Sequence, residues 1–248
     1  MTYKLIFMLL MFTQLNIFAK DFSKTVPLEH LNYELVKSLN PENGEPSKFY
    51  KLSFPGKTQP SLGVVIIKRM DDSFNDVPVF IEGDGTIWSV DKKEEGILGF
   101  DGGYGEKFEI LLAAINKKDE ATPLAKCVII PFPRIVQDDK GHKIELQAAS
   151  PDGCLFTVTG SGFIPKEKVS IASRSCDESM TFSVEVDDNG NFHLGTAPAV
   201  IGKTEGPFEL VFTGKDMKPL KMRHYWGEIA FYKPNSYKEL RNKYKFTN

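Results

Sequence analysis

Alternating polar and apolar residues are the feature that most constrains how this 248-residue chain folds. A period of two residues predicts a strand with one face buried and the other in water. The alternation is complete in Thr181-Phe182-Ser183-Val184-Glu185-Val186, and it recurs in Lys143-Ile144-Glu145-Leu146-Gln147-Ala148 and Phe208-Glu209-Leu210-Val211-Phe212.

Turn-forming pairs separate these runs. Asn-Gly supplies the positive φ angles that a tight hairpin needs. Short strands spaced by such turns predict an all-β sandwich or barrel. The turn signals are Pro55-Gly56, Asp84-Gly85, Pro151-Asp152-Gly153 and Asn189-Gly190.

Helix signals are confined to the two ends of the chain. The stretch from Leu28 to Leu39 predicts a turn or two of helix. Ser236-Tyr237-Lys238-Glu239 has the pattern of a capping box that opens a short helix to about Lys245. The tail, 236–248, has few apolar residues, so we interpret it as a solvated or docked cap rather than a membrane-binding helix.

The amino terminus has the layout of a secretory signal peptide. Lys4 precedes an apolar run from Leu5 to Phe12, and small Ala19 stands just before Lys20. The apolar run is too short for a membrane span, which needs about 20 residues. We therefore expect cleavage after residue 19 and a mature chain, without a membrane span, that is periplasmic or extracellular.

The mature chain is long enough for two domains, and we expect a junction near residues 129–141. Pro131 and Pro133 resist regular strand pairing there, and Asp138-Asp139-Lys140-Gly141 offers a turn. The expected organisation is a signal peptide at 1–19, an N-terminal β-sandwich at 20–132, a C-terminal immunoglobulin-like β-sandwich at 133–235 and a helical tail at 236–248.

Three cysteines enter an oxidising compartment, where pairing is favoured. Cys154 and Cys176 fall in one expected domain and flank two strands, so they are the favoured disulfide, although the spacing does not exclude other pairings or free thiols. Cys127 is then left over. It is read as a small buried apolar residue, with a redox or partner-binding thiol as the alternative.

The two halves of the chain also contain similar motifs in the same order, which suggests two copies of one sandwich. Phe54-Pro55-Gly56-Lys57 corresponds to Phe163-Ile164-Pro165-Lys166, and Asp84-Gly85-Thr86-Ile87 corresponds to Asp188-Asn189-Gly190-Asn191-Phe192. Phe108-Glu109-Ile110-Leu111 corresponds to Phe208-Glu209-Leu210-Val211.

Gly160-Ser161-Gly162-Phe163-Ile164-Pro165-Lys166-Glu167-Lys168-Val169 resembles the G-x-GF-x-PGE-x-V segment of immunoglobulin-like domains in bacterial secreted and surface proteins. The resemblance extends over most of residues 141–232. It implies that Phe163 fills a sandwich core, that Pro165 starts a turn, and that Val169 and Ile171 point inward. Lys166 stands where the pattern has Gly, which leaves the turn type open. Such a motif is informative about fold and nearly silent about ligand.

Catalytic, metal and phosphate motifs are weak. Ser161 lacks the G-x-S-x-G elbow of a hydrolase nucleophile. The glycine-rich stretch Gly99 to Gly105 lacks the Gly-Lys-Ser/Thr ending of a phosphate loop, so we expect a surface loop there. Asp187-Asp188-Asn189-Gly190-Asn191 misses the EF-hand spacing and is read as a hairpin turn. Four scattered histidines show no zinc-ligand spacing, so no metal or cofactor is expected.

Aromatic residues are the remaining candidates for a binding surface. Tyr and Trp are enriched where proteins bind partners. Trp88 and Tyr104 in the first domain and Tyr225-Trp226 in the second are the candidate binding residues, with core packing as the alternative. Because neighbouring residues on a strand face opposite ways, we expect one of Tyr225 and Trp226 to be exposed.

The sequence thus predicts an all-β protein of two immunoglobulin-like β-sandwich domains in tandem with a short terminal helix. We expect a secreted or periplasmic, non-catalytic interaction or scaffolding module whose partner is a protein. The alternative is a carbohydrate-binding module that uses exposed aromatics on a polysaccharide. A secreted hydrolase is a third class and would need a convergent site that the sequence does not show. The net charge of −2 gives no electrostatic footprint for nucleic acid.

Overall fold

The computed structural model describes residues 28–39, 46–56, 58–90, 95–116, 121–231 and 240. The expected signal peptide lies outside these residues, as does the expected terminal helix apart from Leu240. Across the described part, strands dominate, and η1 (Glu228–Phe231), a 3-10 helix, is a short exception. Within the same residues, no helix is long and apolar enough to span a membrane. The all-β prediction is confirmed.

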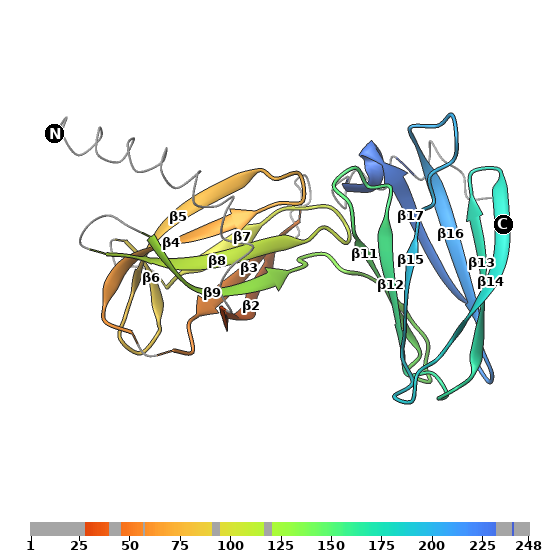
Figure 1. The fold of residues 1–248 in the computed structure, drawn as a ribbon, viewed down its shortest axis with the longest axis horizontal. Coiled ribbons are helices and arrows are strands. Elements are labelled where there is room, and N and C mark those ends of the chain that lie inside the picture. The colour runs from red at the N-terminus through yellow and green to blue at the C-terminus, as the bar shows by residue number, and fades with distance from the viewer. Residues whose placement is uncertain are drawn as a thin grey trace. The chain divides into compact units, whose positions relative to one another are not determined.

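The chain forms two compact units (Figure 1). Among the described residues, the first unit contains 28–38, 48–100 and 108–129. The second contains 39, 46–47, 101–107, 130–231 and 240. The second unit thus begins its main segment at Ile130 and also includes a short stretch, 101–107, that lies much earlier in the chain.

The first unit is a sandwich of a six-stranded and a three-stranded sheet. The six-stranded sheet has the order β1-β9-β8-β4-β5-β6, and the three-stranded sheet has the order β2-β3-β7. In the six-stranded sheet, neighbouring strands pair antiparallel except β1 with β9, which are parallel. In the three-stranded sheet, β3 pairs antiparallel with β7. The strands are β1 (Glu29–His30), β2 (Asn32–Leu39), β3 (Ser47–Ser53), β4 (Ser61–Lys68), β5 (Phe74–Ile81), β6 (Ile87–Ser89), β7 (Ile97–Phe100), β8 (Phe108–Ile115) and β9 (Ala121–Ile129).

A continuous apolar core lies between these two sheets. Leu52 of β3, Val65 of β4 and Leu112 of β8 are buried in it with side chains from most of the other strands. Tyr50 makes edge-to-face ring contact with Phe100 at 5.7 Å. This core orients the hairpin of β5 and β6, which carries the candidate site.

The turn of helix predicted from Leu28 to Leu39 is wrong, because this stretch forms β1 and β2. Leu31 is fully buried in the core, and Tyr33 packs edge-to-face on Tyr50 at a ring separation of 6.0 Å. Leu31 and Tyr33 lie two residues apart and both contact the core, as alternate positions of an extended chain can, although Tyr33 stays 43% exposed. Packing across neighbouring strands therefore determined the secondary structure of this stretch, whose local sequence is compatible with both a helix and a strand.

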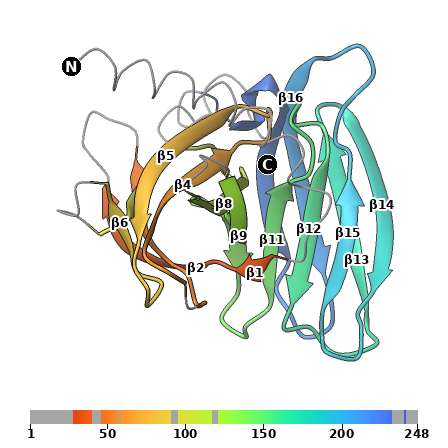
Figure 2. The same cartoon turned by 60° about the vertical axis from the view of Figure 1, so that its left-hand side comes forward.

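The second unit is a sandwich of two four-stranded antiparallel sheets (Figure 2). Their orders are β10-β11-β12-β15 and β14-β13-β16-β17. The chain passes from one sheet to the other after β12, β14 and β15, which is the Greek-key path of an immunoglobulin-like sandwich. The strands are β10 (Arg134–Gln137), β11 (Lys143–Ala148), β12 (Phe156–Ser161), β13 (Lys168–Ser175), β14 (Glu178–Glu185), β15 (Phe192–Thr196), β16 (Glu205–Thr213) and β17 (Leu220–Gly227).

This path corrects one local prediction. Asp187-Asp188-Asn189-Gly190-Asn191 is a turn, but it joins β14 to β15, which lie in different sheets, so it is not a hairpin between paired strands. The Asp187 carboxylate accepts hydrogen bonds from the backbone N–H groups of Asn189 (2.9 Å) and Asn191 (2.8 Å). The carboxylate is thus used to hold the turn.

Phe163 fills the core of the second unit, as the resemblance implies. Its ring lies 5.2 Å from the ring of Phe192, which in turn stacks on Phe212 at 6.1 Å. Val169 and Ile171 are fully buried on the next strand. The serine-glycine stretch that precedes Phe163 is therefore the corner of a sandwich.

The turn after Phe163 keeps its shape although Lys166 replaces Gly. The N–H of Glu167 donates to the carbonyl of Ile164 at 3.2 Å, and Lys166 has a φ of 64°. Pro165 followed by a positive φ is a type II turn. The buried Glu167 carboxylate fixes the corner by accepting from the N–H groups of Ile164 and Lys215, both at 2.8 Å.

The same corner hydrogen bond occurs in both units. The N–H of Phe54 donates to the carbonyl of Gly85 at 2.9 Å, and the N–H of Phe163 donates to the carbonyl of Gly190 at 3.1 Å. Both glycines have positive φ, 88° and 79°. A Cβ at Gly85 would lie 1.8 Å from the Phe54 carbonyl oxygen, so only glycine fits. Two of the three motif pairs found in the two halves of the sequence therefore share this corner contact, although the first turn joins paired strands and the second joins strands of different sheets.

The glycine-rich stretch is packed into the second unit, so its prediction as a surface loop is wrong for residues 102–106. The Gly105 N–H donates to the Phe132 carbonyl at 2.8 Å, and its carbonyl accepts from Ala148 at 3.1 Å. A Cβ at Gly103 would lie 2.5 Å from the backbone of Phe231. The glycines are required here because backbone packs directly against backbone.

We predict that Lys166→Gly raises the free energy of unfolding by about 0.5–1 kcal/mol, because glycine adopts the positive φ without steric cost. Chemical denaturation of the purified chain measures the change. Lys166→Ala is the matched control. Both variants lose the exposed ion pair with Asp188, but alanine keeps the backbone strain, so it should bring no gain. Equal stability of the two variants would contradict the assignment.

Burial lowers the pKa of His224 to about 3, and the nearby positive charge of Arg134 acts in the same direction. The ring is enclosed by Phe156 and Phe208, with centroids at 5.4 and 5.9 Å. Between the unfolded pKa of about 6.5 and the folded value, the unfolded chain binds a proton that the folded chain does not. Protonation therefore favours unfolding in this window.

We expect the free energy of unfolding to fall by up to about 1.4 kcal/mol per pH unit from this group as the pH drops below about 6.5. His224→Gln should flatten the slope between pH 6.5 and 5, as followed by denaturation at each pH. His193→Gln, on an exposed histidine, should keep the wild-type slope. An unchanged slope in His224→Gln would refute the assignment.

Candidate functional site

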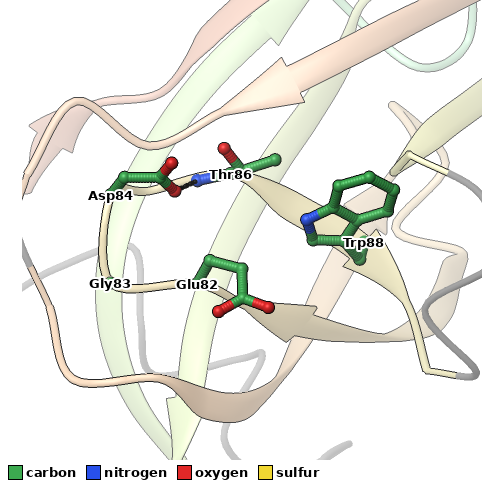
Figure 3. Close-up of a pocket in the computed structure, with 5 residues that line it drawn as sticks. All are labelled: Glu82, Gly83, Asp84, Thr86 and Trp88. Carbon is green, nitrogen blue, oxygen red and sulfur yellow. Dashed lines mark hydrogen bonds between the residues drawn. The ribbon is translucent and has the colours of Figure 1, made fainter.

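A surface hollow lies beside the hairpin that joins β5 and β6 (Figure 3). It encloses about 500 Å³. One aromatic side chain, two carboxylates, a hydroxyl and a glycine backbone line it: Trp88, Glu82, Asp84, Thr86 and Gly83. Trp88 is the one residue of this set that the sequence analysis named as a binding candidate, whereas Asp84 and Thr86 were predicted only as part of a turn motif.

The hairpin turn sets the shape of the hollow. The Gly85 N–H donates to the Glu82 carbonyl at 3.0 Å, and the Glu82 N–H donates to the Thr86 carbonyl at 2.9 Å. The Asp84 carboxylate accepts from the Thr86 N–H at 2.9 Å (Figure 3). These bonds hold Glu82, Thr86 and Trp88 on one side of the hairpin, because alternate residues of a strand share a face.

Trp88 lies on the outer face of the six-stranded sheet. Its direct cross-strand neighbour is Phe80 of β5, and the neighbour of Phe80 is Leu62 of β4. Leu62 is half-exposed, and Trp88 and Phe80 are partly exposed. The three residues form an apolar row across β4, β5 and β6, and Trp88 at its end lines the hollow.

The hollow has acidic character. Hydrogen bonds from the backbone and hydroxyl of Thr86 lower the pKa of Asp84 below its usual range. None of the five lining residues is basic. The hollow therefore presents hydrogen-bond acceptors beside an aromatic face, and the sign of its charge disfavours phosphate and other anions.

The expectation that Tyr225 or Trp226 is exposed is wrong, because both are fully buried. Trp226 lies in the core, and its indole N–H donates to Ser175 at 3.1 Å. Tyr225 faces the other way, as alternation requires, but Ile229 of η1 and Leu240 pack over it. The short 3-10 helix after β17 thus covers the face that the strand pattern leaves open.

Tyr104 is not a free platform either. It packs against Tyr225, Ile229 and Leu240, and the guanidinium of Arg134 lies 5.4 Å from its ring centroid. Arg134 also donates to the carbonyl of Arg223 at 2.8 and 3.1 Å. The structure thus separates the four aromatic candidates: Trp88 lines a hollow, and the other three are parts of packed clusters in the second unit.

The expected disulfide is not formed, and Cys154 and Cys176 both carry free thiols. The Cys154 thiol faces the carbonyl of Asp152 at 3.6 Å, whereas Cys176 occupies the turn between β13 and β14 and faces Gly206. The thiols of Cys154 and Cys176 therefore contact different residues and do not face each other. Cys127 is buried in the first core, and burial raises the pKa of its thiol to about 12, so it is inert.

The structure adds a surface that the sequence analysis missed. Every residue of β2 is exposed, and the strand carries four large apolar side chains. Tyr33, Leu35, Val36 and Leu39 expose 43%, 47%, 43% and 40% of their surfaces. Within the described part of the chain, β2 pairs only with β3, so its other edge is open there. The spacing of two residues from Leu31 through Tyr33 to Leu35 was visible in the sequence, but the helix prediction obscured it.

No group of three or more His, Cys, Asp or Glu side chains in the described ranges is arranged to hold a metal ion. Ser161 is the last residue of β12, paired with Lys143, and leads into the buried corner at Phe163. It therefore does not stand on a strand-to-helix elbow.

Comparison with known proteins found no family model that matches the chain and no curated protein that matches it. Solved structures with local similarity include a tetra-tandem repeat from the extending region of a large adhesion protein (9% identity, TM-score 0.26, 80% of this chain and 48% of that one). A Ca²⁺-stabilised, ice-binding adhesin of an Antarctic bacterium has 8% identity and a TM-score of 0.23 over 82% of this chain and 49% of that one. The FN1–FN3 domains of chicken CNTN1 have 12% identity and a TM-score of 0.26 over 80% and 65%.

The chain spans about half the length of the two adhesin chains. TM-scores this low do not define a shared fold, so the immunoglobulin-like assignment rests on the strand orders and crossings described above.

We predict that Gly85→Ala destabilises the first unit by about 3 kcal/mol or more, because the new Cβ meets the Phe54 carbonyl and the φ of 88° is unfavourable for alanine. Gly83→Ala is the matched control two residues away. Its Cβ would meet the Thr58 carbonyl at 3.4 Å, an ordinary contact, so the cost should be small. Denaturant unfolding compares the two variants, and similar losses would disprove the role of the corner.

Proposed function

We propose that this chain is an exported, non-catalytic protein-binding module that captures an extended segment of its partner along the open edge of β2. The observation that carries the proposal is that all eight residues of this strand are exposed and that four of them are large and apolar. An exposed strand edge offers a row of backbone donors and acceptors to a second chain, and its side chains add apolar contacts.

The other edge strands described in the structure are less suited to strand addition. β1, β6, β7, β10 and β15 have only two to five residues, and short edges limit pairing. β17 has eight residues, but six of them are buried, and Arg134 already donates to the carbonyl of Arg223 in this strand. β14 has eight residues but is mainly polar, with Glu178 and Glu185 at its ends. β2 combines length with apolar side chains, and Glu34 and Lys37 provide opposite charges for register.

The proposal of export rests on the signal-peptide layout of residues 1–19, and the proposal of a non-catalytic role rests on the weakness of the catalytic motifs in the sequence. Both are parts of the proposal. A binding module needs a rigid scaffold. The core beneath β3 and β7 supplies it, because Tyr33 of β2 packs against Tyr50 of β3, which is part of that core.

The test is site-specific photo-crosslinking in the producing cell. A photoreactive phenylalanine analogue at Leu35 should trap a defined partner, and the trapped peptide should map to one extended run of that partner. The same analogue at Val128 is the control, because this β9 side chain is also 47% exposed. A partner trapped equally from both positions would speak against strand addition at β2.

Leu35→Lys provides the second test. A charge on an edge strand opposes pairing, so we expect about tenfold weaker capture of the trapped partner in a binding assay. The melting temperature should change little because Leu35 is exposed. Val128→Lys should bind as the wild type does. Unchanged affinity in Leu35→Lys would refute the proposal.

A further inference from the structure

We infer that the hollow at the β5–β6 hairpin is a binding site for a neutral sugar, with Trp88 stacking on the apolar face of a pyranose ring and Glu82 and Asp84 accepting hydrogen bonds from its hydroxyls. This site is separate from the β2 edge and does not depend on the proposed protein partner. It is the carbohydrate alternative of the sequence analysis, narrowed to one of the four aromatic residues.

The size of the hollow fits a small ligand. Binding sites for small molecules usually enclose about 300–1,000 Å³, and the hollow encloses about 500 Å³. This is room for one or two sugar rings. Figure 3 shows Trp88 on β6, Glu82 and Thr86 beside the turn, and Asp84 in the turn itself.

The lining chemistry excludes several other ligand classes. Phosphates and nucleotides need basic groups or a cluster of free N–H donors, whereas this hollow has two carboxylates. A wholly apolar ligand would exclude water from the carboxylates of Glu82 and Asp84 and would offer them no hydrogen-bond donor in exchange. A sugar has both an apolar C–H face and several hydroxyl donors, so it satisfies the indole and the carboxylates together.

The hairpin holds these groups in place before a ligand arrives. Asp84 is fixed through the Thr86 N–H, and Trp88 is flanked by Phe80 across the strand pair. A preformed site loses less side-chain entropy on binding. By contrast, Tyr104, Tyr225 and Trp226 lie in packed clusters, which leaves Trp88 as the one of the four that lines the hollow.

The chain contains two tryptophans, so ¹H–¹⁵N spectra of the full mature chain should show two indole signals. Trp226 is buried and serves as an internal control. Neutral disaccharides of gluco, galacto and N-acetylglucosamine type are titrated in turn. We expect at least one of them to shift the Trp88 signal saturably while the Trp226 signal stays fixed.

Variants then test the roles of the lining residues. Trp88→Ala should abolish binding, and Glu82→Gln and Asp84→Asn should each weaken it about tenfold or more, because a hydrogen bond to a charged acceptor is lost. Val128→Ala, at an exposed apolar residue of the same sheet, should bind normally. Calorimetric titration measures the affinities in variants whose melting temperatures match the wild type.

Two outcomes overturn the inference. In the first, no neutral sugar shifts the Trp88 signal. In the second, only a cationic probe such as tetramethylammonium shifts it, which would make the hollow a site for ammonium groups through cation–π contact and the carboxylates. Loss of sugar binding would leave the protein-binding proposal intact, because the photo-crosslinking at Leu35 tests that proposal independently.

Discussion

The burial of one face of each sheet is the constraint on which both units depend. Two sheets that pack face to face hide their inner side chains and leave edges and outer faces in water. In the second unit, Phe163, Phe192 and Phe212 form a continuous aromatic contact through the core. Because the interior is committed to packing, any site for a partner or ligand must be built at an edge, a loop or an outer face.

The corner hydrogen bond shows how both sandwiches close. In each unit a buried phenylalanine donates its N–H to a glycine carbonyl in the turn that precedes a later strand. The positive φ of Gly85 and Gly190 brings backbone close to backbone, where a side chain would collide. The corner is thus held by backbone contacts, which explains why its glycines and phenylalanines appear in both halves of the sequence.

The strand pattern predicted the fold well because period-two alternation reports directly on burial. Phe208, Leu210 and Phe212 alternate in sequence and are buried as expected. The errors have a different origin. The burial of Tyr225 depends on Ile229 and Leu240, and the burial of Gly103 depends on Phe231. These contacts join residues far apart in sequence or follow an irregular turn, so no local pattern reports them.

The candidate hollow was only partly predictable for the same reason. Trp88 was identifiable as an aromatic residue in a strand, but its neighbours Glu82 and Asp84 gained meaning only when the hairpin placed them beside it. The open edge of β2 was missed because twelve residues of mixed polarity admit both a helix and a strand. Pairing with β3 settles the choice, and that pairing is not local.

The equivalent corners of the two units suggest how such a site arises on this scaffold. The second residue after the corner glycine is buried in both units, as Ile87 and as Phe192. The third residue is Trp88 in the first unit and the exposed His193 in the second. The core fixes the inward position, whereas the outward one is free to vary without cost to packing. The proposed sugar site thus uses an outward position, which folding constrains less than the inward one.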